Sequence, residues 1–66
     1  MKNFELKNLR LKNRITQKTI ANLLDVDVST YTKKENGQIV FSIKEVSAIK
    51  DFFKLSDAEI VKIFLK

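Results

Sequence analysis

Residues 16–37, TQKTIANLLDVDVSTYTKKENG, contain the pattern that decides the fold of this chain. Ile20 and Leu24 lie one helical turn apart with the small Ala21 beside them, so the three share one face of a helix. Tyr31 supplies an inward anchor on a second helix, and polar and basic neighbours are left for its outer face. The stretch therefore predicts two short helices joined by a tight turn, the second of which can enter a DNA major groove.

Cap residues extend this pattern to five helices. The 66 residues include no proline and one glycine, Gly37, so few residues interrupt a helix. Polar side chains suited to N-capping occur at Asn3, Thr16, Asp27, Ser42 and Ser56. We expect helices at residues 4–12, 17–24, 28–35, 43 to about 54, and 57–66, with Asn13 as a left-handed exit from the first. The expected fold is one compact all-α domain over residues 1–66.

Two of these helices begin with a capping box. Ser42 is followed three residues later by Glu45, and Ser56 by Glu59, which lets each pair satisfy two backbone N–H groups. Apolar residues at helical spacing are expected to face the core: Leu6, Leu9, Val46, Ile49, Phe53, Ile60 and Phe64.

The composition argues against several classes of protein. The chain has no cysteine and no histidine, which removes disulfides, the usual general base and the commonest metal ligands. Asp25 and Asp27 are close enough to act as paired carboxylates, but capping is the simpler role. We therefore expect no enzyme, no metal, no cofactor and no small-molecule ligand. No apolar run approaches the roughly 20 residues of a membrane span, and no secretory signal is visible, so we expect a cytoplasmic protein.

The positive charge is concentrated in the first third of the chain. The net charge is +5, and residues 1–18 hold six basic side chains against Glu5 alone, whereas residues 19–66 balance at seven of each sign. Such a segment suits a polyanion. A mildly basic face also keeps a small domain soluble, and charge alone does not decide between these interpretations.

Six groups of residues around the predicted turn occur in a fixed order: Thr16-Gln17, Ile20-Ala21, Leu24, Val26, Ser29-Thr30-Tyr31 and Glu35-Asn36-Gly37. In this order and spacing they resemble the helix-turn-helix motif of the Cro and lambda-repressor-type (XRE-like) transcriptional regulators, with the motif at about residues 16–35. The resemblance extends from Leu6 to roughly Ile63. It implies a lambda-repressor-like fold and DNA binding.

In the resembling family, the outer face of the second motif helix contacts base edges. The matching positions here are Val28, Ser29, Thr32 and Lys33. Lysine can donate to guanine, valine can pack on a thymine methyl group, and the two hydroxyls can bond several bases. The alternative is an ordinary solvated helix face.

Several other residues are candidates for DNA phosphate contacts. Gln17 lies at a helix N-terminus, where free N–H groups and the helix dipole favour an anion, and the family uses the matching glutamine in this way. The other candidates are Arg14, Lys18, Asn36, Gln38 and Lys44. For Gln38, which precedes the apolar residues 39–41, a contact and no contact are equally compatible with the sequence.

The resemblance also implies an ion pair between Arg10 on the first helix and Glu35 on the third. Glu35 ends a helix, where its charge opposes the dipole and requires a cation. The pair would fix the recognition helix to the rest of the domain.

Four residues depart from the family pattern. Asp25 and Arg14 replace common glycines, and Asp27 replaces a common serine or threonine and would repel a phosphate. Lys34 stands where many relatives have an apolar residue; its stem can cover the core while the amine reaches water.

We expect a sequence-specific regulator of double-stranded DNA, of the phage- or mobile-element repressor type, that binds a near-palindromic operator as a homodimer. The C-terminal helix at residues 57–66 is the candidate dimer element, because it is too apolar for one buried stripe. Its candidate interface residues are Ile60, Val61, Ile63, Phe64 and Leu65, and the alternative is that the small core absorbs these side chains. The alternative function is a protein-interaction module, such as an antitoxin or an anti-repressor partner, that retains the fold.

Overall fold

The computed structural model describes residues 4–65 and contains five α helices and no strand within them. The helices are α1 (Phe4–Lys12), α2 (Gln17–Leu24), α3 (Val28–Glu35), α4 (Ile43–Phe53) and α5 (Asp57–Phe64). The predicted all-α, five-helix fold is confirmed. The expected cap Asn3 and the last residue of the expected fifth helix, Lys66, lie outside the described residues.

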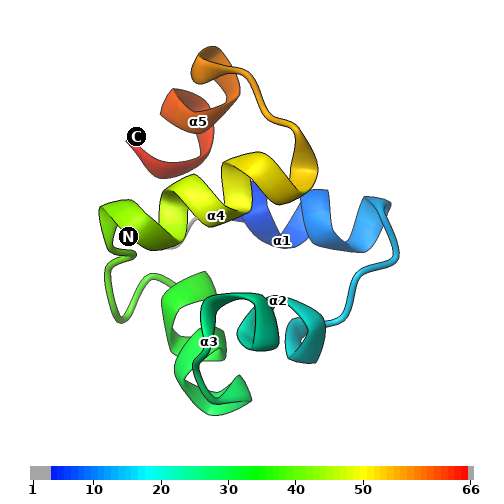
Figure 1. Ribbon diagram of the computed structural model, residues 1–66, viewed down its shortest axis with the longest axis vertical. Helices are drawn as coiled ribbons and strands as arrows, with labels where there is room; N and C mark the ends of the chain where they lie inside the picture. Colours follow the sequence, from blue (N-terminus) through cyan, green and yellow to red (C-terminus); the bar gives the residue numbers. More distant parts are fainter. Residues whose placement is uncertain (1–3, 66) are drawn as a thin grey trace.

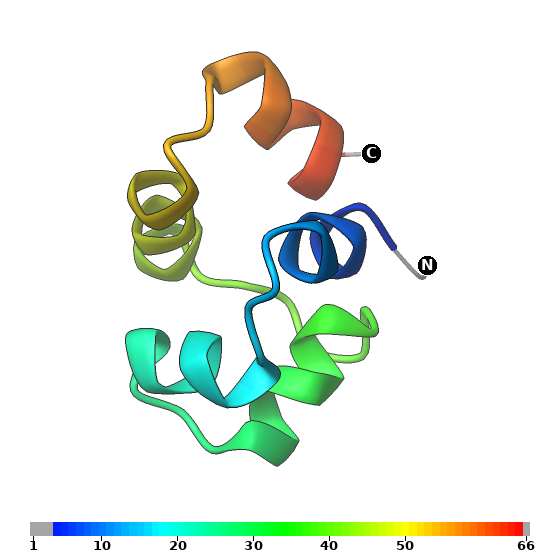
Figure 2. The ribbon, with the colours of Figure 1, turned by 90° about the vertical axis from the view of Figure 1, so that its right-hand side faces the viewer.

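The α1 and α4 helices lie in the middle of the molecule, between the α2–α3 pair and α5 (Figure 1 and Figure 2). Figure 1 shows α2 and α3 together at one end of the molecule and α5 at the other, with α4 between them. The view in Figure 2, turned by 90°, shows that α1 and α4 lie on opposite sides of this middle region. The α2–α3 unit is thus the part of the molecule farthest from α5.

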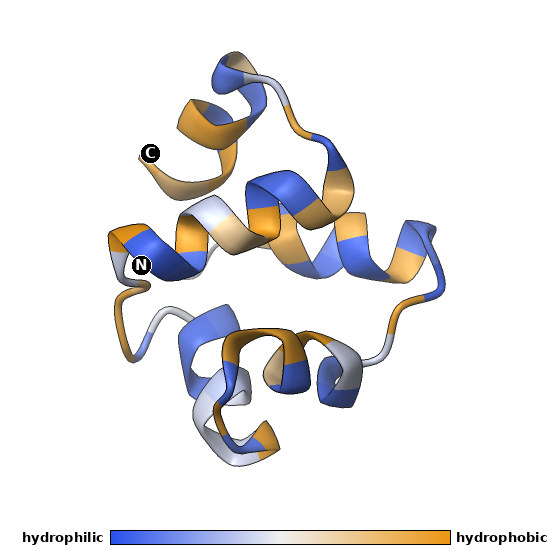
Figure 3. Ribbon diagram, viewed as in Figure 1, coloured by the Kyte–Doolittle hydropathy of each residue, from blue (hydrophilic) through white to orange (hydrophobic). Residues whose placement is uncertain are grey.

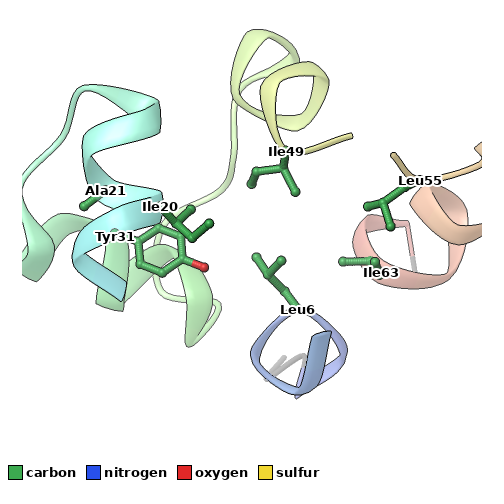
Figure 4. Packing of buried hydrophobic residues seen from close by; sticks show 7 residues of the cluster. All are labelled: Leu6, Ile20, Ala21, Tyr31, Ile49, Leu55 and Ile63. Carbon is green, nitrogen blue, oxygen red and sulfur yellow. The ribbon is translucent and has the colours of Figure 1, made fainter. Parts of the chain in front are cut away.

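One apolar core joins the five helices. Its buried members come from α1 to α4, from the α4–α5 connection and from α5: Leu6, Ile20, Ala21, Tyr31, Ile49, Leu55 and Ile63. Figure 4 shows Leu6 of α1 between the α2–α3 residues on one side and Leu55 and Ile63 on the other. The core therefore fixes the α2–α3 unit to the rest of the domain.

Local caps set most helix boundaries. Thr16 accepts a hydrogen bond from the Thr19 N–H, and both expected capping boxes are formed, at Ser42 with Glu45 and at Ser56 with Glu59. Gly37 has φ 83°, as its position after α3 requires. Asp27 occupies the N-cap position of α3, but its side chain makes no capping hydrogen bond.

Two details of the helix ends were predicted wrongly. The left-handed residue after α1 is Arg14, with φ 57°, and not Asn13. The Asn13 side chain instead donates to the Leu9 carbonyl at 2.8 Å, and the same carbonyl accepts from the Asn13 N–H at 3.2 Å. The fifth helix ends at Phe64 and not at the last residue of the chain.

None of the described helices is long and apolar enough to cross a membrane. Residues 4–65 also contain no cluster of three or more metal-ligating side chains.

Candidate nucleic-acid interface

The turn between α2 and α3 depends on one left-handed residue. Asp25 has φ 59° and ψ 45°, and the Val26 N–H then donates to the Ala21 carbonyl at 3.0 Å. Ala21 has no exposed surface, so its small side chain allows the neighbouring backbone to approach closely. This turn directs α3 across α2.

A buried carboxylate fixes α3 to both preceding helices. Oε2 of Glu35 accepts from Arg10 Nε at 2.9 Å and from the Tyr31 hydroxyl at 2.7 Å, and Oε1 accepts from Arg10 Nη2 and Gln17 Nε2, each at 3.2 Å. The remaining Arg10 nitrogen, Nη1, donates to the Ile15 carbonyl at 2.9 Å. The side chains of Arg10 and Glu35 are only 8% and 2% exposed. The structure therefore contains the implied ion pair, within a larger network that joins α1, α2 and α3.

The network sets the protonation state of its members. Burial alone would raise the pKa of Glu35, but hydrogen bonds from Arg10, Tyr31 and Gln17 outweigh it and hold the pKa below its usual range. The hydrogen bond to Glu35 raises the pKa of Arg10 despite burial. Burial and the bond to Glu35 raise the pKa of Tyr31 far above its usual value. The pair therefore stays ionised, and the tyrosine stays neutral, around neutral pH.

The amide of Gln17 is bonded inside the protein. Its Nε2 donates to Glu35, and its Oε1 accepts from the Thr32 hydroxyl at 3.1 Å. The side chain thus bridges the buried pair and the partly exposed face of α3. No local pattern indicates this contact, because Gln17 and Thr32 are fifteen residues apart.

The outer face of α3 is largely free of contacts with the rest of the domain. Val28, Ser29 and Lys33 are exposed, whereas Thr32 is half-buried. Among residues 4–65, no side-chain hydrogen bond or ion pair engages Ser29 or Lys33. In Figure 3 most of α3 is pale or blue, in contrast to the orange segments of the core-facing helices. The four expected base-contacting residues therefore lie on one accessible surface.

The expected phosphate-contacting residues surround both ends of the α2–α3 unit. Arg14 precedes α2 and Lys18 lies in its first turn, while Asn36 is the C-cap of α3. Gln38 lies in the following loop, where its N–H donates to the Lys33 carbonyl at 2.8 Å, and Lys44 lies in the first turn of α4. The side chains of these five residues are exposed, and within residues 4–65 none of them makes a hydrogen bond or an ion pair.

Lys34 differs from its expected role. Its ammonium does not extend into water but donates to Glu45 at 3.0 Å and to the Val40 carbonyl at 3.1 Å. Only 10% of the Lys34 side chain is exposed, and the ammonium lies 5.7 Å from the centre of the Phe41 ring. The lysine thus connects the end of α3 to the start of α4. The predicted capping box indicated that an acidic side chain, Glu45, stands at the start of α4, and this was the feature of the sequence that pointed to the pair.

The expected dimer residues at the C-terminal end of the chain differ in how much of each side chain is exposed. Val61 and Leu65 are 52% and 72% exposed, whereas Ile60 and Phe64 are half-buried against the core. The assignment of Ile63 to the interface was wrong, because this side chain is 6% exposed and completes the core between Leu6 and Leu55.

A groove of about 540 Å³ lies beside α5 and the α3–α4 loop. Its lining is mainly apolar and includes Val40 and Ile43, which are 86% and 90% exposed, together with Leu65. Val40 and Ile43 were not among the expected interface residues. Their adjacency to Leu65 could not be predicted from residue spacing, since it depends on how α5 folds back on α4.

The chain matches a known protein family. A family model described as "Helix-turn-helix domain" matches residues 4–62, which is almost all of the chain. Neither the curated proteins nor the solved structures that were compared gave a match. The family is a DNA-binding one and is typically non-enzymatic. The match agrees with the resemblance to XRE- and Cro-like regulators, and the chain belongs to the helix-turn-helix domain family.

Proposed function

We propose that this protein is a sequence-specific transcriptional regulator that binds double-stranded DNA by inserting α3 into the major groove. The observation that carries the proposal is the outward face of α3, held in place by the buried network around Glu35. Docking of a rigid, polar helix face into the groove is how helix-turn-helix proteins contact base edges.

The proposed base contacts follow from the chemistry of the exposed side chains. Lys33 donates to guanine O6 and N7, and Val28 packs against a thymine methyl group. Ser29 and Thr32 supply hydroxyl contacts to neighbouring bases. Lys33, near the C-terminal end of the face, thus makes the charged contact, and Val28, at its N-terminal end, makes the apolar contact.

The proposed phosphate contacts flank this face on both sides. Arg14 and Lys18 supply cations at the start of α2, and Gln17 supplies a backbone N–H at the helix N-terminus, since its amide is engaged with Glu35 and Thr32. Asn36, Gln38 and Lys44 contact the backbone beyond the end of α3. These contacts position the helix without selecting a sequence.

A homodimer is proposed from the size of the molecule and from its exposed apolar residues. The longest extent of the Cα positions is 28 Å, whereas two half-sites on one face of DNA are spaced by roughly 34 Å. Two copies are needed to occupy both, which favours a near-palindromic operator. Val61 and Leu65, beside the groove of Val40 and Ile43, are the proposed contacts between the copies.

We further propose that binding in the cytoplasm represses transcription, as in a phage- or mobile-element-type repressor, and that residues 1–66 act as one domain. An α3 bound in the groove competes with other proteins for the same DNA. Repression requires no additional contact with the transcription machinery.

A protein-interaction module is the second candidate, and the exposed apolar groove favours it. An antitoxin or an anti-repressor partner would use this groove to hold another protein, with or without DNA binding. DNA binding and partner binding would use different surfaces, because Val40 and Ile43 do not belong to the outward face of α3.

Selection of bound sites from a random duplex pool tests the proposal. We expect enrichment of a two-fold symmetric site, with affinity that falls steeply with salt, by about 10³-fold or more between 50 and 200 mM if six or more phosphates are contacted. Lys33→Ala should relax preference at one position per half-site, whereas Lys18→Ala should weaken all sites alike. Absence of duplex binding even at low salt would overturn the proposal and favour the interaction module.

A further inference from the structure

The hydroxyl of Thr32 has its single proton committed inside the protein. A threonine hydroxyl offers one proton and two acceptor lone pairs. Thr32 Oγ1 lies 2.8 Å from the Val28 carbonyl oxygen and 3.1 Å from Gln17 Oε1. Both neighbours are acceptors, so the proton points toward one of them, and the exposed side of the hydroxyl presents lone pairs.

The buried ion pair determines which end of the Gln17 amide faces Thr32. Gln17 Nε2 lies 3.2 Å from Oε1 of Glu35, a carboxylate that can only accept. The reversed amide would place two acceptor oxygens against each other. Because Glu35 is itself fixed by Arg10 and Tyr31, the amide oxygen is held toward Thr32.

Ser29, one turn earlier on the same face, provides an internal contrast. Its side chain is exposed, and no group among residues 4–65 engages its hydroxyl. Ser29 can therefore either donate to a base or accept from one. Two hydroxyls on one helix face thus differ in the hydrogen bonds that they can offer to a ligand.

We infer that Thr32 acts as an acceptor-only contact and selects a base with an exocyclic amino group on the strand that it faces. This inference rests on the proposed function. In the major groove the donors on base edges are adenine N6 and cytosine N4, whereas thymine O4 and guanine O6 and N7 are acceptors. Adenine or cytosine satisfies the lone pairs of Thr32, and thymine or guanine places an acceptor against them.

The expected discrimination is that of a single neutral hydrogen bond. To donate to a base acceptor, the Thr32 proton would have to give up its hydrogen bond to the Val28 carbonyl or to Gln17 Oε1. Such a bond contributes about 1 kcal/mol net, which corresponds to roughly a fivefold change in affinity. This preference is smaller than that expected from the charged contact of Lys33.

Single-group changes in the selected operator test the inference. Adenine is replaced by purine, or cytosine by pyrimidin-2-one, at each position of the half-site, so that only the exocyclic amino group is lost. Affinity is measured for the wild-type protein and for Thr32→Val, which keeps the shape of the side chain and removes the hydroxyl. We expect one position at which loss of the amino group weakens wild-type binding about fivefold and leaves Thr32→Val unaffected.

Two controls accompany the cycle. Thr32→Ser should retain the coupling, and Ser29→Ala should leave it unchanged, with thermal melts showing that each variant folds. Coupling of Thr32 to an acceptor instead, measured with 7-deaza bases that lack N7, would overturn the inference and leave the proposed function intact. Absence of coupling to any base would do the same. Failure to select any duplex would overturn both.

Discussion

Among the described residues 4–65, three adopt left-handed backbone without being glycine: Arg14, Asp25 and Lys54. Each follows a helix and turns the chain into the next one. For residues with a Cβ this conformation costs roughly 1–2 kcal/mol. The turn between α2 and α3 therefore forms with Asp25 at a conformational cost that glycine would not have.

Asp25→Gly should stabilise the domain, since glycine adopts φ 59° without steric cost. Part of the gain is lost to the greater freedom of glycine in the unfolded chain, so we expect about 0.5–1 kcal/mol. In a domain of this size that is a rise in melting temperature of about 2–8 °C. Asp25→Ala, which keeps the Cβ, is the control and should not stabilise; a lower melting temperature for Asp25→Gly would show that the turn is built differently.

Arg10→Ala should destabilise the protein far more than Lys7→Ala. Removing Arg10 leaves the Glu35 carboxylate buried without its cation, a loss on the order of 3–5 kcal/mol. Lys7 is an exposed cation on the same helix, and its removal should change the unfolding free energy by about 0.5 kcal/mol or less. Urea unfolding of both variants measures the difference, and equal shifts would contradict a stabilising role for the buried pair.

The same carboxylate makes the domain sensitive to acid. Because the folded pKa of Glu35 lies below its unfolded value of about 4.3, the unfolded state binds more protons as the pH falls. The contribution of Glu35 to stability is therefore complete above that value and is lost as the pH falls through the folded pKa. Glu35→Gln should flatten this acid limb in unfolding measurements between neutral and acid pH; an unchanged limb would assign it to other carboxylates, such as Glu45.

At the scale of helices, the sequence predicted the boundaries of α1, α2 and α3 well, because local signals determine them. Thr16 caps α2 through its own side chain, and the two capping boxes start α4 and α5 in the same way. Arg14 was the exception, since either of two adjacent residues could take the left-handed position. In the structure Asn13 stays hydrogen-bonded to the Leu9 carbonyl, and Arg14 takes the left-handed position.

Contacts between helices were less predictable than their boundaries. The Gln17–Thr32 and Lys34–Glu45 contacts join residues that are fifteen and eleven positions apart, and they exist only when the helices cross as they do. Ile63 was misassigned for the same reason. An apolar α5 has several faces that could point inward, and only its packing on α1 and α4 selects one.

The two capping boxes allow the Lys34 contact to be measured. Glu45 and Glu59 have the same capping role, but only Glu45 also accepts from Lys34. Glu45→Ala should therefore cost more stability than Glu59→Ala, by roughly 1.5–3 kcal/mol for the additional charged hydrogen bond. Lys34→Met should remove this difference. Equal losses in calorimetric melts would mean that Lys34 contributes nothing to the connection between α3 and α4.

At the scale of the whole molecule, two surfaces with different chemistry lie apart. The outward face of α3 is polar and basic, whereas the groove beside α5 is apolar and contains Val40 and Ile43. The first suits a nucleic acid, and the second suits another protein surface, which we assign to a second copy of the chain. Because the groove does not include the outward face of α3, the proposed dimer would leave both recognition helices free.

The central claim is that α3 binds in the major groove of DNA. Amide chemical-shift mapping of the isotope-labelled protein with the selected duplex tests this claim most directly. We expect the largest changes at Val28 to Lys33 and in the first turn of α2, with smaller changes around Arg14 and Lys44. Chemical-shift changes confined to α5 and to residues 39–43, with α3 unaffected, would contradict the claim that α3 binds in the DNA major groove.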